Sequence, residues 1–176
     1  MNKFFLIFLL FLGTIHSTWA QKSGYVDTDY ILNNIPEYKD AQQTLDKLAA
    51  DWQKEIDAKY AEIDKLYKAY QADALLLTED MRKKRENEII NKEKEVRELQ
   101  KQRFGVDGEL FKKRQELVKP IQDKVYNAIK AVADKKGIAF VFDKAGAVTL
   151  LYANSKYDLS EEVIKELGIN KNKSKK

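Results

Sequence analysis

The sequence predicts a mainly α-helical protein in which a long antiparallel coiled-coil hairpin projects from a small β-rich body. Three observations lead to this prediction. Only two prolines occur, Pro36 and Pro120, and the charged segment between them has the periodicity of helices. A turn signal lies midway between these prolines, at Thr78. The β-rich runs lie outside the charged segment, near residues 25–27 and 138–152.

The N-terminal segment, residues 1–20, is typical of a secretory signal peptide. Lys3 precedes an apolar run from Phe4 to Leu12, which is too short to anchor the chain across a bilayer. Small residues before Gln21 predict cleavage after Ala20. We therefore expect export, with a retained signal anchor as the alternative.

The chain that remains after this cleavage lacks the usual catalytic side chains. The full sequence contains no cysteine, and its only histidine, His16, lies in the predicted signal peptide, so the remaining chain has neither residue. This excludes Ser-His-Asp and Cys-His nucleophile systems, redox dithiols and zinc sites of the usual kind. The carboxylates are spread along predicted helix faces rather than gathered in a cleft, so we expect no enzyme, cofactor or metal. Basic residues are interleaved with acids, which argues against a nucleic-acid partner.

The first predicted helix follows Pro36. Its apolar and small residues recur at helical spacing and form one thin seam, interrupted by four-residue steps around Trp52. These residues are Tyr38, Ala41, Leu45, Leu48, Trp52, Ile56, Ile63, Leu66 and Tyr70. The exposed tyrosines Tyr60 and Tyr67 fit either the seam or a contact surface.

A turn is predicted between Asp73 and Thr78, so the tip of the hairpin falls near residues 73–80. Thr78 is a candidate N-cap, and the acids that follow it suit the first turn of a helix. The second helix is predicted to run, with some bending, as far as Lys136. Its seam is Met81, Ile89, Val96, Leu99, Val106, Leu110, Leu117, Ile121, Val125, Ile129 and Val132.

Folding the two helices together pairs positions equidistant from Thr78 and predicts an arm over residues 37–119. Trp52 then lies opposite Phe104 and Gly105, and we interpret Gly105 as making room for the indole. The alternative is that Gly105 and Gly108 mark a flexible joint in the second helix. An excess of acids in the first helix and of bases in the second favours this docking.

Residues 21–36 and 120–170 are predicted to form a β-rich oligomerisation body. Ile138–Asp143 and Ala147–Tyr152 predict a hairpin around Gly146, with Tyr25–Asp27 as a third strand. Three strands cannot shield both of their faces, so helix ends or another subunit must cover them. The candidate body residues are Tyr25, Val26, Phe140, Phe142, Val148 and Leu150. A last helix is predicted from Asp158 to Leu167, and residues 171–176 form a basic tail.

Short motifs follow one another along the whole exported chain. They are Val26-Asp27, Asn34 to Lys39, the long charged helices, Phe140 to Asp143, Leu151 to Ala153, and Tyr157 to Ser160. In this order and spacing they resemble the Skp/OmpH family of periplasmic chaperones. The resemblance implies a homotrimer with a shared β body, whose three arms enclose a cavity that holds unfolded outer-membrane proteins without ATP. A structural coiled-coil spacer of the envelope is the alternative.

The densest basic run, Arg82-Lys83-Lys84-Arg85, lies beside the predicted tip. There it would meet acidic client segments or anionic lipid headgroups. The alternative is a solvated pair of helical turns in which Glu86 and Glu88 neutralise these bases.

Overall fold

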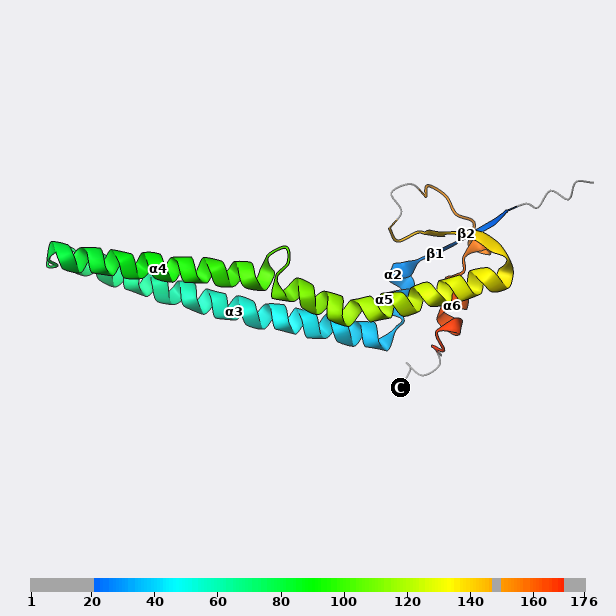
Figure 1. Ribbon diagram of the computed structural model, residues 1–176, viewed down its shortest axis with the longest axis horizontal. Helices are drawn as coiled ribbons and strands as arrows, with labels where there is room; N and C mark the ends of the chain where they lie inside the picture. Colours follow the sequence, from blue (N-terminus) through cyan, green and yellow to red (C-terminus); the bar gives the residue numbers. More distant parts are fainter. Residues whose placement is uncertain (1–20, 147–149, 170–176) are drawn as a thin grey trace, which may run out of the picture.

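The computed structural model describes residues 21–146 and 150–169. Within these residues the protein is mainly helical and has one two-stranded sheet. Long helices form an arm that projects from a body containing the sheet and the shorter helices (Figure 1). The predicted signal peptide, the predicted strand residue Val148 and the basic tail lie outside the described residues.

The arm begins with helices α3 (Pro36–Asp73) and α4 (Glu79–Phe104), which lie side by side. Pro36 occupies the first turn of α3, where its missing N–H costs no hydrogen bond. Thr78 caps α4 by accepting a hydrogen bond from the Met81 N–H at 3.4 Å. The turn between the helices therefore lies where the sequence predicts it, at the end of the arm farthest from the sheet (Figure 1).

The prediction of one continuous second helix is wrong. Helix α4 ends at Phe104, and α5 (Glu109–Lys136) begins after a short loop between Gly105 and Gly108. A Cβ on Gly105 would lie 2.4 Å from the Lys101 carbonyl oxygen, so this close backbone turn requires glycine. Val106, placed in the apolar seam by its spacing, is instead 90% exposed in the loop. Pro120 lies inside α5 and marks no break.

The sheet consists of β1 (Lys22–Val26) and β2 (Ile138–Asp143), which run parallel and pair Tyr25 with Phe142. The sequence predicts a hairpin between β2 and residues 147–152, but the described residues 150–152 form no strand. Gly137 ends α5 in the left-handed conformation, at φ 62°, directly before β2. A parallel pair needs a long crossover, and here the entire arm is that crossover.

Two short helices complete the body. Helix α2 (Thr28–Asn33), which the sequence analysis did not predict, is capped by Asp27, whose carboxylate accepts from the Tyr30 N–H at 2.9 Å. Helix α6 (Ser160–Glu166) follows the 3₁₀ turn η1 (Ser155–Tyr157). The body core gathers Val26, Ile31, Leu32, Ile35, Ala41, Ile121, Val125, Ala128, Val132, Leu159, Val163 and Ile164.

Candidate functional site

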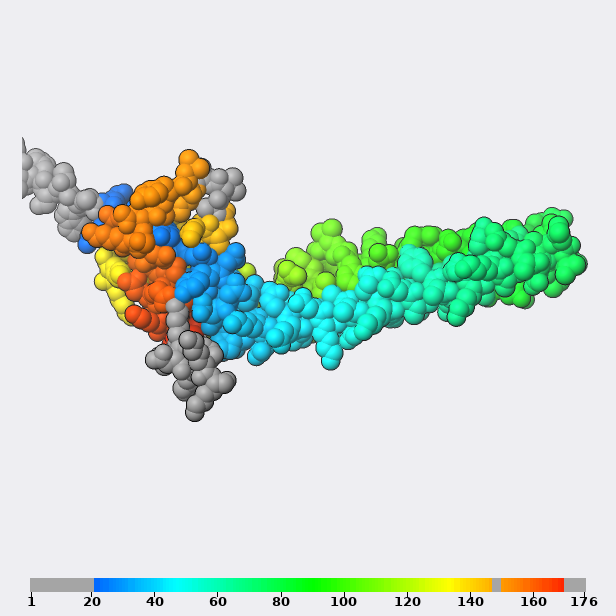
Figure 2. All heavy atoms as spheres, turned by 180° about the vertical axis from the view of Figure 1, so that it is seen from behind, coloured from blue at the N-terminus to red at the C-terminus, as the bar shows by residue number. Residues whose placement is uncertain are grey.

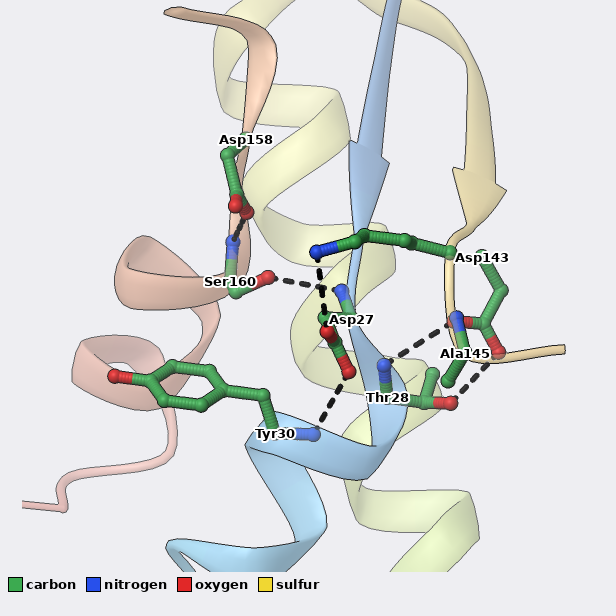
Figure 3. A network of polar contacts seen from close by, with 8 residues as sticks. Asp27, Thr28, Tyr30, Asp143, Ala145, Asp158 and Ser160 are labelled. Carbon is green, nitrogen blue, oxygen red and sulfur yellow. Dashed lines mark hydrogen bonds and ion pairs between the residues drawn. The ribbon is translucent and has the colours of Figure 1, made fainter. Parts of the chain in front are cut away.

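A network of hydrogen bonds joins the chain segments of the body (Figure 3). The Asp143 carboxylate at the end of β2 accepts from the Thr28 N–H at 3.1 Å and from the Thr28 hydroxyl at 2.6 Å. The Asp27 N–H donates to the buried Ser160 hydroxyl oxygen at 2.9 Å. The network therefore holds the end of β2 and the start of α6 against the end of β1. It also sets the orientation of the exposed face of β2.

That surface carries large apolar side chains exposed to solvent. Phe140 and Phe142 are both 54% exposed, and their spacing along β2 puts them on the same face of the strand. Leu151 and Tyr152, which come eight and nine residues after the end of β2, are 98% and 80% exposed. Two strands are too few to stabilise a sheet alone, so this face is a candidate contact surface.

The other predicted body residues have different environments. Tyr25 and Val26 are buried on β1, and Val26 belongs to the core of the body. Leu150 is half-buried. The sequence therefore grouped core and surface residues together, because strand propensity does not distinguish the covered face from the open face.

The arm has a narrow apolar interior. Ile56 and Ile63 of α3 pack with Ile89 and Val96 of α4, and partly buried neighbours flank them. Polar pairs cross between the helices: Lys92 Nζ lies 2.9 Å from a Glu62 carboxylate oxygen, and the Tyr70 hydroxyl donates to Glu86 at 2.5 Å. The hydrogen bond and charge of Lys92 lower the pKa of Glu62 below its ordinary value.

A second cluster surrounds the break between α4 and α5. The Trp52 and Phe104 rings meet edge to face, with centroids 6.2 Å apart. The Arg103 guanidinium lies over the Trp52 ring and pairs with Glu55 at 3.6 Å and with Glu109. Gln102 also donates to Glu109, at 2.7 Å. These contacts connect α3, α4 and α5 beside the loop.

Gly105 is required by the backbone turn at the end of α4 rather than by the side chain of Trp52. The nearest atoms to a Cβ at Gly105 belong to Lys101, not to the indole of Trp52. Making room for the indole is therefore the wrong interpretation. The alternative, in which Gly105 and Gly108 mark a joint, matches the observed helix break.

The tip combines basic and apolar residues. Within the run Arg82–Arg85, Lys83 pairs with Glu79 at 2.9 Å and Arg85 with Glu88 at 3.8 Å. Leu75 and Leu76 in the preceding turn are 95% and 86% exposed. Sequence reasoning selected the bases but overlooked these leucines, although three consecutive leucines within a predicted turn were the available signal.

A groove of about 650 Å³ follows the arm between α3 and α4. Its polar lining combines acids and bases, including the paired Glu62 and Lys92, above apolar residues such as Ile63 and Val96. Within residues 21–146 and 150–169, no cluster of three or more side chains is arranged to hold a metal ion. In the same residues, no helix has the length and apolar character of a membrane span.

Comparison with known proteins places these features in context. Residues 22–167 match the family described as "Outer membrane protein (OmpH-like)". An uncharacterised Aquifex aeolicus protein is 32% identical over 95% of this chain and 96% of its own length. The chaperone protein Skp of Vibrio cholerae is 27% identical over 84% of each chain. The crystal structure of an OmpH-like protein from Caulobacter crescentus shares the fold, with a TM-score of 0.66 and 14% identity over 84% of each chain.

Proposed function

This chain belongs to the OmpH-like family, a family of chaperones rather than enzymes, and we propose that it holds unfolded outer-membrane proteins in the periplasm and prevents their aggregation without ATP. The observation that carries this proposal is the arm itself. It extends far beyond the body, yet the cluster near its centre buries only Ile56, Ile63, Ile89 and Val96 (Figure 1). Most of the arm surface is therefore available for contact.

The surface of the arm suits many weak contacts better than one deep site. Tyr60, Tyr67 and Ile90 are 40%, 50% and 55% exposed and are separated by charged side chains. Each such contact is weak, but several contacts on one chain raise the overall affinity while each still releases quickly. Binding of the unfolded client lowers the free concentration that drives aggregation, and no nucleotide is needed.

We further propose that three copies share the body as a homotrimer. The exposed Phe140 and Phe142, together with Leu151 and Tyr152, supply apolar surface near a sheet that has two strands within residues 21–146 and 150–169. Strands from other copies would extend this sheet and cover that surface. The Asp143 network would then hold β2 in the orientation that assembly needs.

Light scattering tests the holding activity. A urea-denatured β-barrel membrane protein is diluted into buffer with and without a few-fold excess of this protein. Suppression of scattering without ATP supports the proposal. Unchanged scattering would instead favour an envelope spacer, which needs no unfolded client.

A further inference from the structure

A groove of about 290 Å³ lies where the arm joins the body. Its walls are the first two turns of α3, with Tyr38 and Gln42, and the N-terminal half of α5, from Phe111 to Gln122. Figure 2 shows this junction, at the light-blue start of α3. The volume is near the lower end of the range for small-ligand sites, so the groove holds a short segment rather than a folded domain.

Aromatic rings line the groove from both helices. Phe111 is 43% exposed and belongs to neither of the two core clusters, so its ring is available for a contact. Tyr38 packs partly against the body core, which holds its ring in place on the α3 side. Aromatic side chains contribute much of the energy of protein contacts, and they favour another aromatic ring as a partner.

Side-chain amides supply polar contacts along the same groove. Gln42, Gln115 and Gln122 line it, and none of the three forms a side-chain hydrogen bond within the described residues. Gln115 and Gln122 are seven residues apart, which is about 10 Å along a helix and about the length of three residues of extended chain. An amide offers both donors and an acceptor, so each glutamine matches a peptide group of an extended chain.

The charge of the groove is positive. Arg114 is exposed and forms no ion pair within the described residues, whereas Lys113 and Lys119 beside it pair with Glu116 and Asp123. Among the described residues that line the groove there is no acid, in contrast to the groove between α3 and α4, which has acids and bases. One unpaired guanidinium suits a carboxylate, whereas phosphate-rich partners need several cations together.

We propose that this groove is a client subsite, which binds an extended unfolded segment in which an aromatic residue lies next to an acidic one. The aromatic side chain packs against Tyr38 and Phe111, the carboxylate binds Arg114, and the three glutamines bind the backbone. The four lysines of residues 170–176 disfavour the C-terminus of this chain as the occupant, because they would place like charge beside Arg114. The inference rests on the proposed holding function and names the kind of segment that it prefers.

Fluorescence anisotropy with short peptides tests this preference. The exported protein, starting at Gln21, is titrated into fluorescein-labelled Gly-Ser peptides that carry a central Phe-Glu, Phe-Lys or Leu-Glu pair. We expect the Phe-Glu peptide to bind about fivefold or more tightly than the Phe-Lys peptide, because Arg114 attracts the carboxylate and repels the ammonium group. The Leu-Glu peptide is expected to bind more weakly than the Phe-Glu peptide, because it lacks the aromatic contact.

Variants assign the binding to the groove. Arg114→Gln is expected to abolish the preference for Phe-Glu over Phe-Lys. Lys124→Gln is the matched control, since it removes one charge from α5 outside the groove. Phe111→Ala is expected to weaken both peptides that contain Phe by about fivefold. Tyr126→Ala is its control, because Tyr126 is 66% exposed on the same helix but does not line the groove. Helical circular dichroism checks that each variant is folded.

Three results would overturn the proposal. The first is equal affinity of the parent protein for the Phe-Glu and Phe-Lys peptides. The second is an equal loss of binding in Arg114→Gln and Lys124→Gln, which would assign the preference to overall charge. The third is ready disulfide linkage of Phe111→Cys between copies of a chain that has no native cysteine, which would assign the groove to a second copy.

Light scattering with the denatured β-barrel protein, measured in parallel, separates this subsite from the holding function. If the parent protein suppresses aggregation but binds the peptides without preference, the subsite is wrong and the holding function stands. If the parent protein does not suppress aggregation, the holding function itself is wrong.

Discussion

The Arg103 guanidinium lies 4.6 Å from the centre of the Trp52 ring and joins the two long helices beside the break in the arm. Arg103 is only 23% exposed and also pairs with Glu55 and Glu109. One side chain thus contacts α3 and α5 from the end of α4. These contacts connect the three helices at the point where the returning half of the hairpin is no longer helical, between Gly105 and Gly108.

Replacing Arg103 is therefore expected to destabilise the arm. Arg103→Met loses the cation–π contact and both ion pairs, and we expect the free energy of unfolding to fall by about 1–2 kcal/mol. Arg97→Met is the matched control, because Arg97 lies on the same helix in an exposed pair with Glu93. Urea denaturation followed by helical circular dichroism measures both changes. Equal losses would contradict the role given to Arg103.

The glycines of the break are expected to resist substitution. A Cβ on Gly108 would lie 2.8 Å from the Gly105 backbone nitrogen, and Gly105 is closer still to Lys101. We expect Gly105→Ala and Gly108→Ala each to lower the free energy of unfolding by about 1 kcal/mol or more. Gly146→Ala is the control, since its Cβ would meet Asp143 at an ordinary 3.7 Å. Thermal unfolding that leaves all three variants equal to the parent would show that the loop relaxes freely.

Ser160 is expected to be important for the stability of the body. Ser160→Ala leaves the Asp27 N–H without its hydrogen-bond acceptor next to the core, which costs about 1–3 kcal/mol. Ser155→Ala, at an exposed position in η1, should change stability far less. Chemical denaturation compares the two variants. A smaller loss for Ser160→Ala than for Ser155→Ala would argue against the network of Figure 3 as the fixing element of the body.

The Glu62–Lys92 pair predicts that the stability of the arm depends on pH in the acidic range. Lys92 lowers the pKa of Glu62 below its ordinary value of 4.5, so the folded state binds a proton there less readily than the unfolded state. The stabilisation is present above the ordinary pKa and is lost as the pH falls through the lowered pKa. Glu62→Gln should therefore flatten the loss of stability between about pH 5 and pH 3.

Urea midpoints measured across this pH range check the prediction. Glu98→Gln is a suitable control, because Glu98 lines the same groove but forms no ion pair within the described part of the chain. If Glu62→Gln and Glu98→Gln change the acid limb of the curve equally, the pair with Lys92 does not account for it.

Local chemistry in the sequence predicted much of the arm. Thr78 and the acids after it placed the turn, because capping depends on neighbouring residues alone. The seam positions Ile56, Ile63 and Ile89 are buried, since helical spacing determines which residues share a face. The break was predicted only as an alternative, because Val106 continues the apolar spacing of a single helix, while the close backbone contacts at Gly105 appear only in three dimensions.

The body was less predictable, because its contacts are long-range. Strand propensity indicated both β2 and a strand at Tyr25–Asp27, but it gave residues 147–152 as the hairpin partner of β2, whereas β2 pairs with β1 near the start of the described chain. Pairing of Tyr25 with Phe142 depends on the arm returning to its starting point. At the tip, spacing placed Met81 in the seam, yet Met81 is 52% exposed. Helix α3 ends at Asp73, before it could cover the first turn of α4, where Met81 lies.

The mass of a client complex tests the central claim most directly. A urea-denatured β-barrel membrane protein is diluted into this protein, and size exclusion coupled to multi-angle light scattering gives the mass of the eluted species. The account predicts one soluble species with the mass of three copies of this chain plus one client. Elution of this chain as a monomer, with the client lost to aggregates, would contradict it.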